Sequence, residues 1–401
     1  MAVLRLSGQA AEFVGWVVLA RRLGTSAYGQ LAVAFLIARY AGLVADWGAS
    51  FRGARDVAAD GRHGSIRQYV RKRTRTSILL ALGAVAVAFA AHQPGLAPMA
   101  VVVLSLGLSR DWIAVGRERG ARSGIPLAAQ GALVLVGSLF AMTVPAAAIA
   151  VAVGYGAAAL LSILLNPLGP ESATEDEATT HGWILAAVLA NQITSSTDTV
   201  LLSLLRSTSA AGIYAAVYRL PNAWLAILAL MLGSLLPMAT SSHHHDPAGH
   251  LHLRRRSLRV SAVGAALILF VTPFTWFLVP VLFGPAYRPG QVPLAILMVA
   301  TAVITFTAPL HPFALATGRD RAYALVLVLG ASGNIGANLL IIPWLGMTGA
   351  ALTTLAAQSV ISIQLWRLVR RYGHGPAPDL ATATPDDAAQ GAPDDPDVEA
   401  E

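Results

Sequence analysis

The sequence predicts an all-α integral membrane protein, and three observations support this fold class. Of its 401 residues, 55% are hydrophobic and only 12% are charged, and the mean hydropathy is +0.61. Long stretches, such as 123–170 and 322–366, carry no charged residue. The basic residues gather in alternate gaps between the apolar segments. Because such a composition cannot cover a surface in water, most of the chain is expected to lie in lipid as helices.

About twelve transmembrane helices are expected when each apolar stretch of about 20 residues is taken as one crossing of the bilayer. Val144-Pro145 and Pro343-Trp344-Leu345-Gly346 divide the two longest charge-free stretches. The expected spans are 3–20, 29–50, 77–92, 97–116, 124–143, 146–166, 182–204, 212–239, 258–282, 291–317, 322–342 and 347–368. An even number of spans places both termini on the same side of the membrane.

The basic residues predict which side that is, because positive charge is retained in cytoplasmic loops. Of the 28 basic residues, 21 fall in or beside the gaps after spans two, four, eight, ten and twelve. Four fall on the opposite side, namely Arg21, Arg22, Arg206 and Arg288. We therefore expect cytoplasmic N and C termini in a multi-pass protein of the bacterial inner (plasma) membrane. The net charge of +7 follows from these topogenic arginines, so no nucleic-acid partner is expected.

The spans are expected to form two six-helix bundles, 1–166 and 182–372. An acidic cytoplasmic linker, 167–181, separates them. Residues 373–401 hold eight acidic and no basic residues, and we expect them to form a disordered cytoplasmic tail.

A short internal repeat supports the division into two halves. Thr25-Ser26-Ala27-Tyr28-Gly29 matches Thr208-Ser209-Ala210-Ala211-Gly212 at an offset of 183 residues, and each copy follows the first span of a half. Repeats with an even number of spans have the same orientation in the membrane, as in transporters built from parallel repeats.

Charged residues fall inside the expected spans, where each needs a partner or a cavity because a charge at the bilayer centre costs at least ~2.5 kcal/mol. Those that the topology does not explain are Arg5, Glu12, Arg39, Asp46, Asp198 and Arg219. Helical spacing arranges them, together with asparagines, on shared helix faces. The same-face pairs are Arg5 with Glu12, Arg39 with Asp46, Asn191 with Asp198, Arg219 with Asn222, and Asn334 with Asn338.

Two interpretations of these residues stay open. The three acids and three arginines can neutralise one another as ion pairs between helices, which their equal numbers permit. They can also line a hydrated lumen that binds a charged substrate and a coupling cation, which their clustering in the leading helices of both halves favours. The two interpretations are compatible, since a pair can form in one conformation and separate in another.

Four segments resemble signatures of the polysaccharide transporters (Wzx-type O-antigen flippases) of the multidrug/oligosaccharidyl-lipid/polysaccharide exporter superfamily. Residues 19–29, LARRLGTSAYG, with Asp46-Trp47-Gly48 downstream, are similar to an Ala-Arg-x-Leu-Gly-Pro-x-x-Tyr/Phe-Gly signature, although Thr25 replaces the usual Pro. The other three segments are 198–214, Phe283-Gly284-Pro285-Ala286-Tyr287 and 341–351. Together they extend from the first span to the last.

The resemblance implies a MATE-like fold whose two bundles surround a cavity that opens to one side and then to the other. It also implies that an oligosaccharide on a polyprenyl pyrophosphate is moved to the outer leaflet for cell-surface polysaccharide or lipopolysaccharide synthesis. The partners would be this lipid-linked oligosaccharide, the bilayer, and the polysaccharide polymerase or ligase machinery.

Arg5, Arg39 and Arg219 are candidates for binding the pyrophosphate or acidic sugars, because a guanidinium binds phosphate oxygens bidentately and stays charged. The other candidates for lining the cavity are Asn191, Asn222, Asn334 and Asn338. Asp198, Glu12 and Asp46 are candidates for coupling to a proton or a sodium ion.

Other functions stay open. One is a lipid II flippase, although fourteen spans would be expected in such a protein and twelve are expected here. A cation-coupled small-molecule or drug exporter of the MATE branch would be favoured by a more acidic cavity. A membrane glycan ligase or polymerase would need a large outer loop, and the expected outer loops are all short. Lys72 is the only lysine and no glycine-rich loop precedes it, which excludes ATP hydrolysis by a P-loop. We expect a protein that is not an enzyme and that needs no metal or cofactor.

Overall fold

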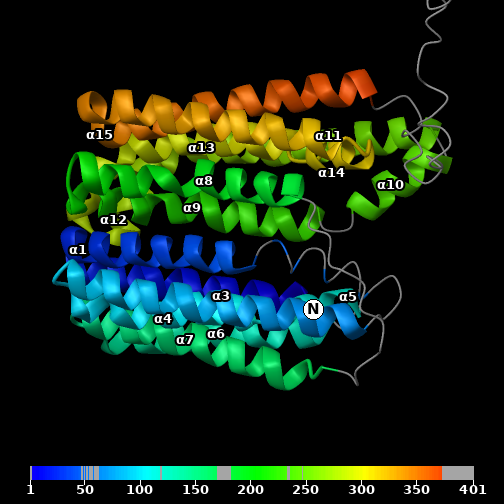
Figure 1. Cartoon of the computed structure of the whole chain (residues 1–401). Coiled ribbons are helices and arrows are strands. Elements are labelled where there is room, and N and C mark those ends of the chain that lie inside the picture. Colours follow the sequence, from blue (N-terminus) through cyan, green and yellow to red (C-terminus); the bar gives the residue numbers. More distant parts are fainter. Residues whose placement is uncertain are drawn as a thin grey trace, which may run out of the picture.

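The computed structural model describes residues 2–46, 63–117, 120–168, 182–232, 235–245 and 247–372, with isolated positions between 47 and 57. Within this part of the chain all regular structure is helical, which confirms the predicted fold class. Figure 1 shows two groups of long, roughly parallel helices, one from each half of the sequence. The predicted tail, and the linker from residue 169 onward, lie outside the described residues.

The first bundle begins with α1, a long helix that contains the first two expected spans. The helix bends at Gly24, where φ is +73°, a conformation that glycine adopts at no steric cost. The bundle consists of α1 (Ala2–Asp46), α3 (His63–Ala90), η1 (Pro94–Met99), α4 (Ala100–Leu108), α5 (Asp111–Gly116), α6 (Gly120–Phe140) and α7 (Val144–Leu165). Thr143 caps α7 by accepting a hydrogen bond from the Ala146 amide, at the predicted division between two spans.

The second bundle ends with a long bent helix of the same kind, α15. Its bend is at Gly346, where φ is +55°, inside the segment predicted to divide spans eleven and twelve. The bundle consists of α8 (Gly182–Leu205), α9 (Thr208–Leu232), α10 (Leu235–His245), α11 (Pro247–Val271), η2 (Thr272–Phe274), α12 (Thr275–Phe283), η3 (Pro285–Gly290), α13 (Gln291–Thr307), α14 (Leu310–Ala316) and α15 (Asp320–Tyr372).

Eight helical segments in the described residues are long and apolar enough to cross a membrane, and two of them, Val3–Asp46 and Asp320–Tyr372, each hold two expected spans. Large apolar side chains on the outside, such as Phe140 and Trp344, fit contact with lipid. Helices α8 and α9 are not among the eight, and both carry polar residues of the same-face pairs predicted from the sequence.

Two helices begin more than ten residues before the apolar spans predicted within them. Helix α3 begins at His63 rather than at 77, and α11 begins at Pro247 rather than at 258. Both extensions are rich in arginine. A helix continues beyond the apolar core where its charged residues reach the headgroup region, and hydropathy does not detect that part.

The bundles meet along α1, which packs against α8 and α9. One hydrophobic core contains buried side chains of both halves, among them Trp16 and Tyr28 from α1 and Val217 from α9. The buried Tyr287 hydroxyl donates to the Ala20 carbonyl at 2.8 Å and so ties η3 to α1. Two of the signature segments therefore contact each other across the interface.

Candidate functional site

The two copies of the internal repeat contact each other where the bundles meet. The Ser209 hydroxyl donates to Thr25 Oγ1 at 2.8 Å, and the Ser26 and Thr208 hydroxyls lie 3.1 Å apart. With the offset of 183 residues, Thr25 and Ser26 each contact the residue next to their counterpart in the other copy, which is the reciprocity of a two-fold interface.

Glycine allows the helices to come this close. A Cβ atom on Gly29 would collide with the Thr208 carbonyl, and one on Gly212 would collide with the Thr25 carbonyl. The contact adjoins the Gly24 bend and Arg206, at the end that the basic residues predict to lie outside the cytoplasm. The two bundles are thus in backbone contact at that end.

Further along the interface, Arg219 of α9 lies on the aromatic face of Trp16 of α1. The guanidinium carbon is 3.7 Å from the Trp16 ring centroid, and Nε donates to the Tyr28 hydroxyl at 3.1 Å. A cation held against an aromatic face is attracted by the ring quadrupole. Both contacts leave other guanidinium N–H groups available to an anion.

Arg39 approaches the same aromatic group. Its guanidinium carbon is 5.9 Å from the Phe35 ring centroid, and that of Arg219 is 6.0 Å from the same centroid. Among the residues that the structure describes, neither arginine has a carboxylate within 4.0 Å. Two predicted substrate-binding arginines, one from each half, therefore flank one ring without an ionic partner.

Glu12 lies beside this group and is held by neutral donors. Its Oε1 accepts from the Tyr155 hydroxyl at 3.1 Å and from Trp16 Nε1 at 3.3 Å, and its Oε2 accepts from Gln130 Nε2 at 2.9 Å. Trp16 thus contacts the carboxylate through its N–H edge and Arg219 through its face. The structure brings Glu12, Arg39 and Arg219 near one aromatic group, a set that the spacing had not placed together.

Arg5, Asn191 and Asn222 are the other predicted cavity residues of α1, α8 and α9. Arg5 lies on the same predicted polar face of α1 as Glu12, nearer the N-terminus, and donates to Ser123 Oγ at 2.8 Å. Asn191 and Asn222 are exposed on α8 and α9. Tyr40 links α1 to α8 through a 3.1 Å contact between its hydroxyl and Thr197 Oγ1.

A second polar cluster is buried inside the second bundle around Asp198, which is 1% exposed. Oδ1 accepts from Asn338 Nδ2 at 2.7 Å, and Oδ2 accepts from the Tyr214 hydroxyl at 2.9 Å and from Thr354 Oγ1 at 2.5 Å. Asn338 also donates to Asn334 Oδ1 at 3.1 Å. Both halves of α15 supply partners, so the bend at Gly346 builds the cluster.

This cluster contains several oxygens and one negative charge but no arginine or lysine. Thr353 donates to Asn338 Oδ1, and the Ala350 carbonyl accepts from the Thr353 and Thr354 hydroxyls. The buried Nδ2 atom of Asn334 has no hydrogen-bond partner. Carboxylate, amide, hydroxyl and backbone oxygens are the ligands of hard cations.

The third predicted coupling residue, Asp46, has an ionic partner that the sequence did not indicate. Its Oδ1 lies 2.8 Å from Nη2 of Arg73, which also donates to the backbone carbonyls of Leu106 and Ser109. Ser50 donates to both Asp46 oxygens. The sequence placed Arg73 among the cytoplasmic loop charges, whereas the structure buries it inside α3, with 2% of the residue exposed.

Comparisons with known proteins bear on the fold of this chain and not on the roles of these residues. No known family description matches the sequence. An uncharacterized membrane protein of Methanocaldococcus jannaschii is 29% identical over 109 residues, which are 27% of this chain and 22% of that protein. The matched segment thus spans about a fifth of that relative.

Solved structures match over nearly the whole chain. The lipid II flippase MurJ in an inward closed conformation has a TM-score of 0.71 and 11% identity, over 92% of this chain and 87% of MurJ. The chain has the fold of the MOP-superfamily transporters. An inward-facing MATE multidrug transporter of that superfamily gives a TM-score of 0.64 at 11% identity, over 93% and 98% of the two chains. The Vibrio cholerae MATE transporter VcmN gives 0.62 at 14% identity, over 92% and 94%. The MOP fold and a multi-pass membrane location are therefore both established, which confirms the expectation of a MATE-like architecture.

Proposed function

We propose that this chain is a non-enzymatic flippase that moves a polyprenyl-pyrophosphate-linked oligosaccharide from the cytoplasmic to the outer leaflet. Arg39 and Arg219 carry this proposal. They come from different halves, flank the same aromatic ring and have no carboxylate partner in the described residues. Guanidinium groups bind phosphate oxygens in a planar fork, so two of them on facing elements suit a pyrophosphate.

Alternating access fits the contact between the two repeat copies. Release of a substrate on the outer side requires the bundles to separate where Gly29 meets Gly212 and where Thr25 meets Ser209. Two hydroxyl pairs and a glycine contact form a tight but small seal. Such a contact can break and reform as a ligand shifts the balance between two conformations.

We propose that Asp198 couples this movement to a proton or a monovalent cation. An ionised carboxylate buried with neutral donors alone is costly, because hydrogen bonds from Tyr214, Asn338 and Thr354 supply no countercharge. A bound proton or cation removes that cost. Since the cluster joins both segments of α15 to α8 and α9, its occupancy can bias the shape of the second bundle.

A cation-coupled small-molecule exporter is the second candidate function. Glu12 and Asp198 are both held without a cationic partner among the described residues, which would also serve a carrier of organic cations. Arg39 and Arg219, which have no carboxylate partner among the described residues, oppose this function because they repel a cationic substrate.

A flipping assay distinguishes the two candidates. Purified protein in liposomes is given a fluorescent lipid-linked oligosaccharide, and the accessible fraction is measured without ATP. Arg219→Gln should slow flipping about tenfold, the effect of losing a charged hydrogen bond of ~1.4 kcal/mol. Arg75→Gln, an exposed change on α3, is the matched control. Equal flipping by both variants, or transport of a small cation in place of the lipid, would contradict the proposal.

Cross-linking tests the outer contact separately. The chain has no cysteine, so Thr25→Cys with Ser209→Cys introduces a single reactive pair. We expect oxidation to stop flipping and a reductant to restore it, because the bundles must part at this point. Full flipping by the oxidised protein would show that the contact stays closed during transport.

A further inference from the structure

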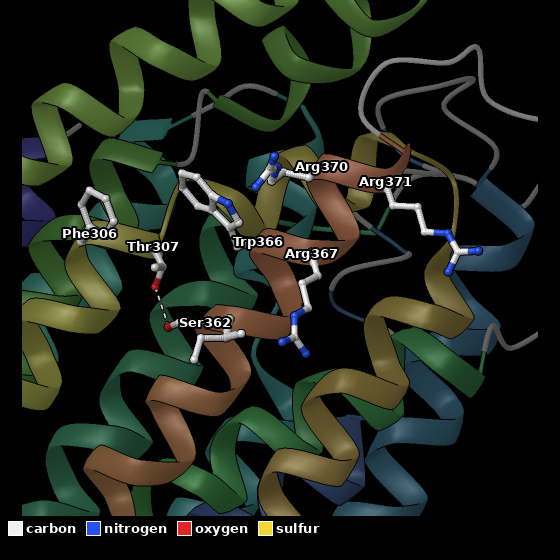
Figure 2. Close-up of a pocket in the computed structure, with 8 residues that line it drawn as sticks. Phe306, Thr307, Ser362, Trp366, Arg367, Arg370 and Arg371 are labelled. Carbon is white, nitrogen blue, oxygen red and sulfur yellow. Dashed lines mark hydrogen bonds between the residues drawn. The ribbon is translucent and has the colours of Figure 1, made fainter.

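A pocket in the second bundle lies apart from the interface between the halves. It has a volume of about 610 Å³ and lies between α13 and the last turns of α15. Phe306, Ile363 and Trp366 supply apolar walls, and Arg367, Arg370 and Arg371 supply positive charge (Figure 2).

The floor of the pocket is fixed. The Thr307 and Ser362 hydroxyls lie 2.8 Å apart and join α13 to α15, and Thr307 also donates to the Val303 carbonyl at 2.8 Å. Both residues are buried. The walls above them are therefore held at a constant spacing.

The three arginines stand at i, i+3 and i+4 on α15, and they are exposed. Figure 2 shows their side chains fanning out from the helix, with Arg370 beside the Trp366 ring. None of the three has a carboxylate within 4.0 Å in the part of the chain that the structure describes. Arg254 of α11 adds further positive potential, because it lies close enough to Arg370 to repel it.

We expect the pocket to face the bilayer near its predicted cytoplasmic boundary. In Figure 1 the end of α15 lies at the edge of the second bundle farthest from the first. Helices α13 and α15 pack on α8, α9, α11 and α14, all within the second bundle. Ile363 is 52% and Trp366 37% exposed next to the arginines, and such aromatic and basic belts mark the headgroup level of a membrane.

We propose that this pocket binds the headgroup of an anionic phospholipid with two phosphate charges, of the cardiolipin type, from the cytoplasmic leaflet. The guanidinium groups bind the phosphates, and the Phe306 and Ile363 walls contact the upper part of the acyl chains. Basic pockets between transmembrane helices on the cytoplasmic side select such lipids, since each arginine near the surface adds to the attraction. Three arginines match a doubly charged headgroup better than a singly charged one. This inference does not depend on which substrate the protein transports.

Lipid binding by the full-length protein tests the proposal. Native mass spectrometry measures how much cardiolipin or phosphatidylglycerol stays bound during titration in detergent. We expect cardiolipin to bind about fivefold more tightly than phosphatidylglycerol, and the Arg367→Ala, Arg370→Ala, Arg371→Ala triple variant to bind it at least about tenfold more weakly.

Two further variants keep the test decisive. A triple variant of exposed arginines elsewhere, Arg71→Ala, Arg75→Ala and Arg256→Ala, has the same change in charge, and we expect it to weaken cardiolipin binding less than about twofold. The charge-preserving change of all three pocket arginines to lysine should weaken it about threefold, because lysine lacks the bidentate fork. Equal weakening by the two alanine triples, or none by either, would overturn the proposal.

Further binding measurements distinguish cardiolipin from other occupants of the pocket. Soluble inorganic pyrophosphate should not displace cardiolipin, and full displacement would make this an anion site rather than a lipid site. Tighter binding of a polyprenyl pyrophosphate, lost in the pocket triple, would make it a substrate site.

Neutralising the eight acidic residues of 373–401 in the full chain should leave cardiolipin binding unchanged. A large gain would instead identify the tail as the occupant.

Discussion

Asp46 and Asp198 are both carboxylates in apolar helices, one in each half, and their surroundings differ in charge. Asp46 lies 2.8 Å from the buried guanidinium of Arg73. Asp198 accepts hydrogen bonds from Tyr214, Asn338 and Thr354, which are all neutral. The first carboxylate has a countercharge within the protein, whereas the second has only neutral partners among the described residues.

This difference separates a structural role from a coupling role. A buried ion pair is complete in itself, and breaking it leaves a charge uncompensated. Under the proposed coupling role, the charge of Asp198 is balanced only when a proton or a cation is bound, so the stability of the cluster would depend on what is bound. We therefore interpret Asp46 as a link between α1 and α3, and Asp198 as the residue that responds to an ion.

The largest expected effect is on stability at the ion pair. Arg73→Ala should lower the free energy of unfolding by ~3–5 kcal/mol, because it leaves Asp46 without its countercharge and the carbonyls of Leu106 and Ser109 without a donor. Thermal unfolding in detergent measures this loss. Arg75→Ala, on the exposed side of the same helix, should change stability by less than ~0.5 kcal/mol. Similar melting of the two variants would show that the pair does not hold α3 to α1.

The sequence predicted the helix faces better than it predicted their partners. Spacing alone placed Asn334 with Asn338 on one face of a helix, and the structure shows them hydrogen-bonded to each other. Periodicity identifies the polar face of a helix but not the helix that it contacts. That Asp198 of α8 completes this group was therefore not predictable.

The neutral hydrogen-bond donors around these carboxylates were also not predicted from the sequence. Tyr155 and Gln130 contact Glu12, and Tyr214 contacts Asp198, and neither carboxylate has an ion pair among the described residues. These donors carry no charge that stands out in an apolar helix. Arg73 was missed for the opposite reason, since its charge was counted with a basic segment that the hydropathy had assigned to a loop.

The second largest effect is expected at Asp198 and concerns rate. Asp198→Asn should slow flipping at least about tenfold, or ~1.4 kcal/mol, because the side chain no longer binds a proton or cation. Its stability should stay within ~1 kcal/mol of the unchanged protein, since the substitution removes a buried charge and keeps the shape. Flipping in proteoliposomes, with a proton or a sodium gradient, measures the rate.

Asp46→Asn is the matched control for this experiment. It breaks the pair with Arg73, so it should lower stability while the rate per folded molecule is kept. If Asp46→Asn slows flipping by the folded protein as much as Asp198→Asn does, the proposed difference in role between the two carboxylates is wrong.

The smallest effect is expected at Glu12, whose surroundings differ from those of both aspartates. Like Asp198 it accepts only neutral hydrogen bonds, but it is not fully buried, and Trp16 connects it to Arg219. Glu12→Gln should weaken substrate binding about threefold, ~0.65 kcal/mol, because a looser Trp16 orients Arg219 less well. The concentration dependence of flipping should then show a raised half-saturation value and an unchanged maximal rate. A maximal rate that falls as far as in Asp198→Asn would instead place Glu12 in the coupling mechanism, and one carboxylate in each half would respond to the ion.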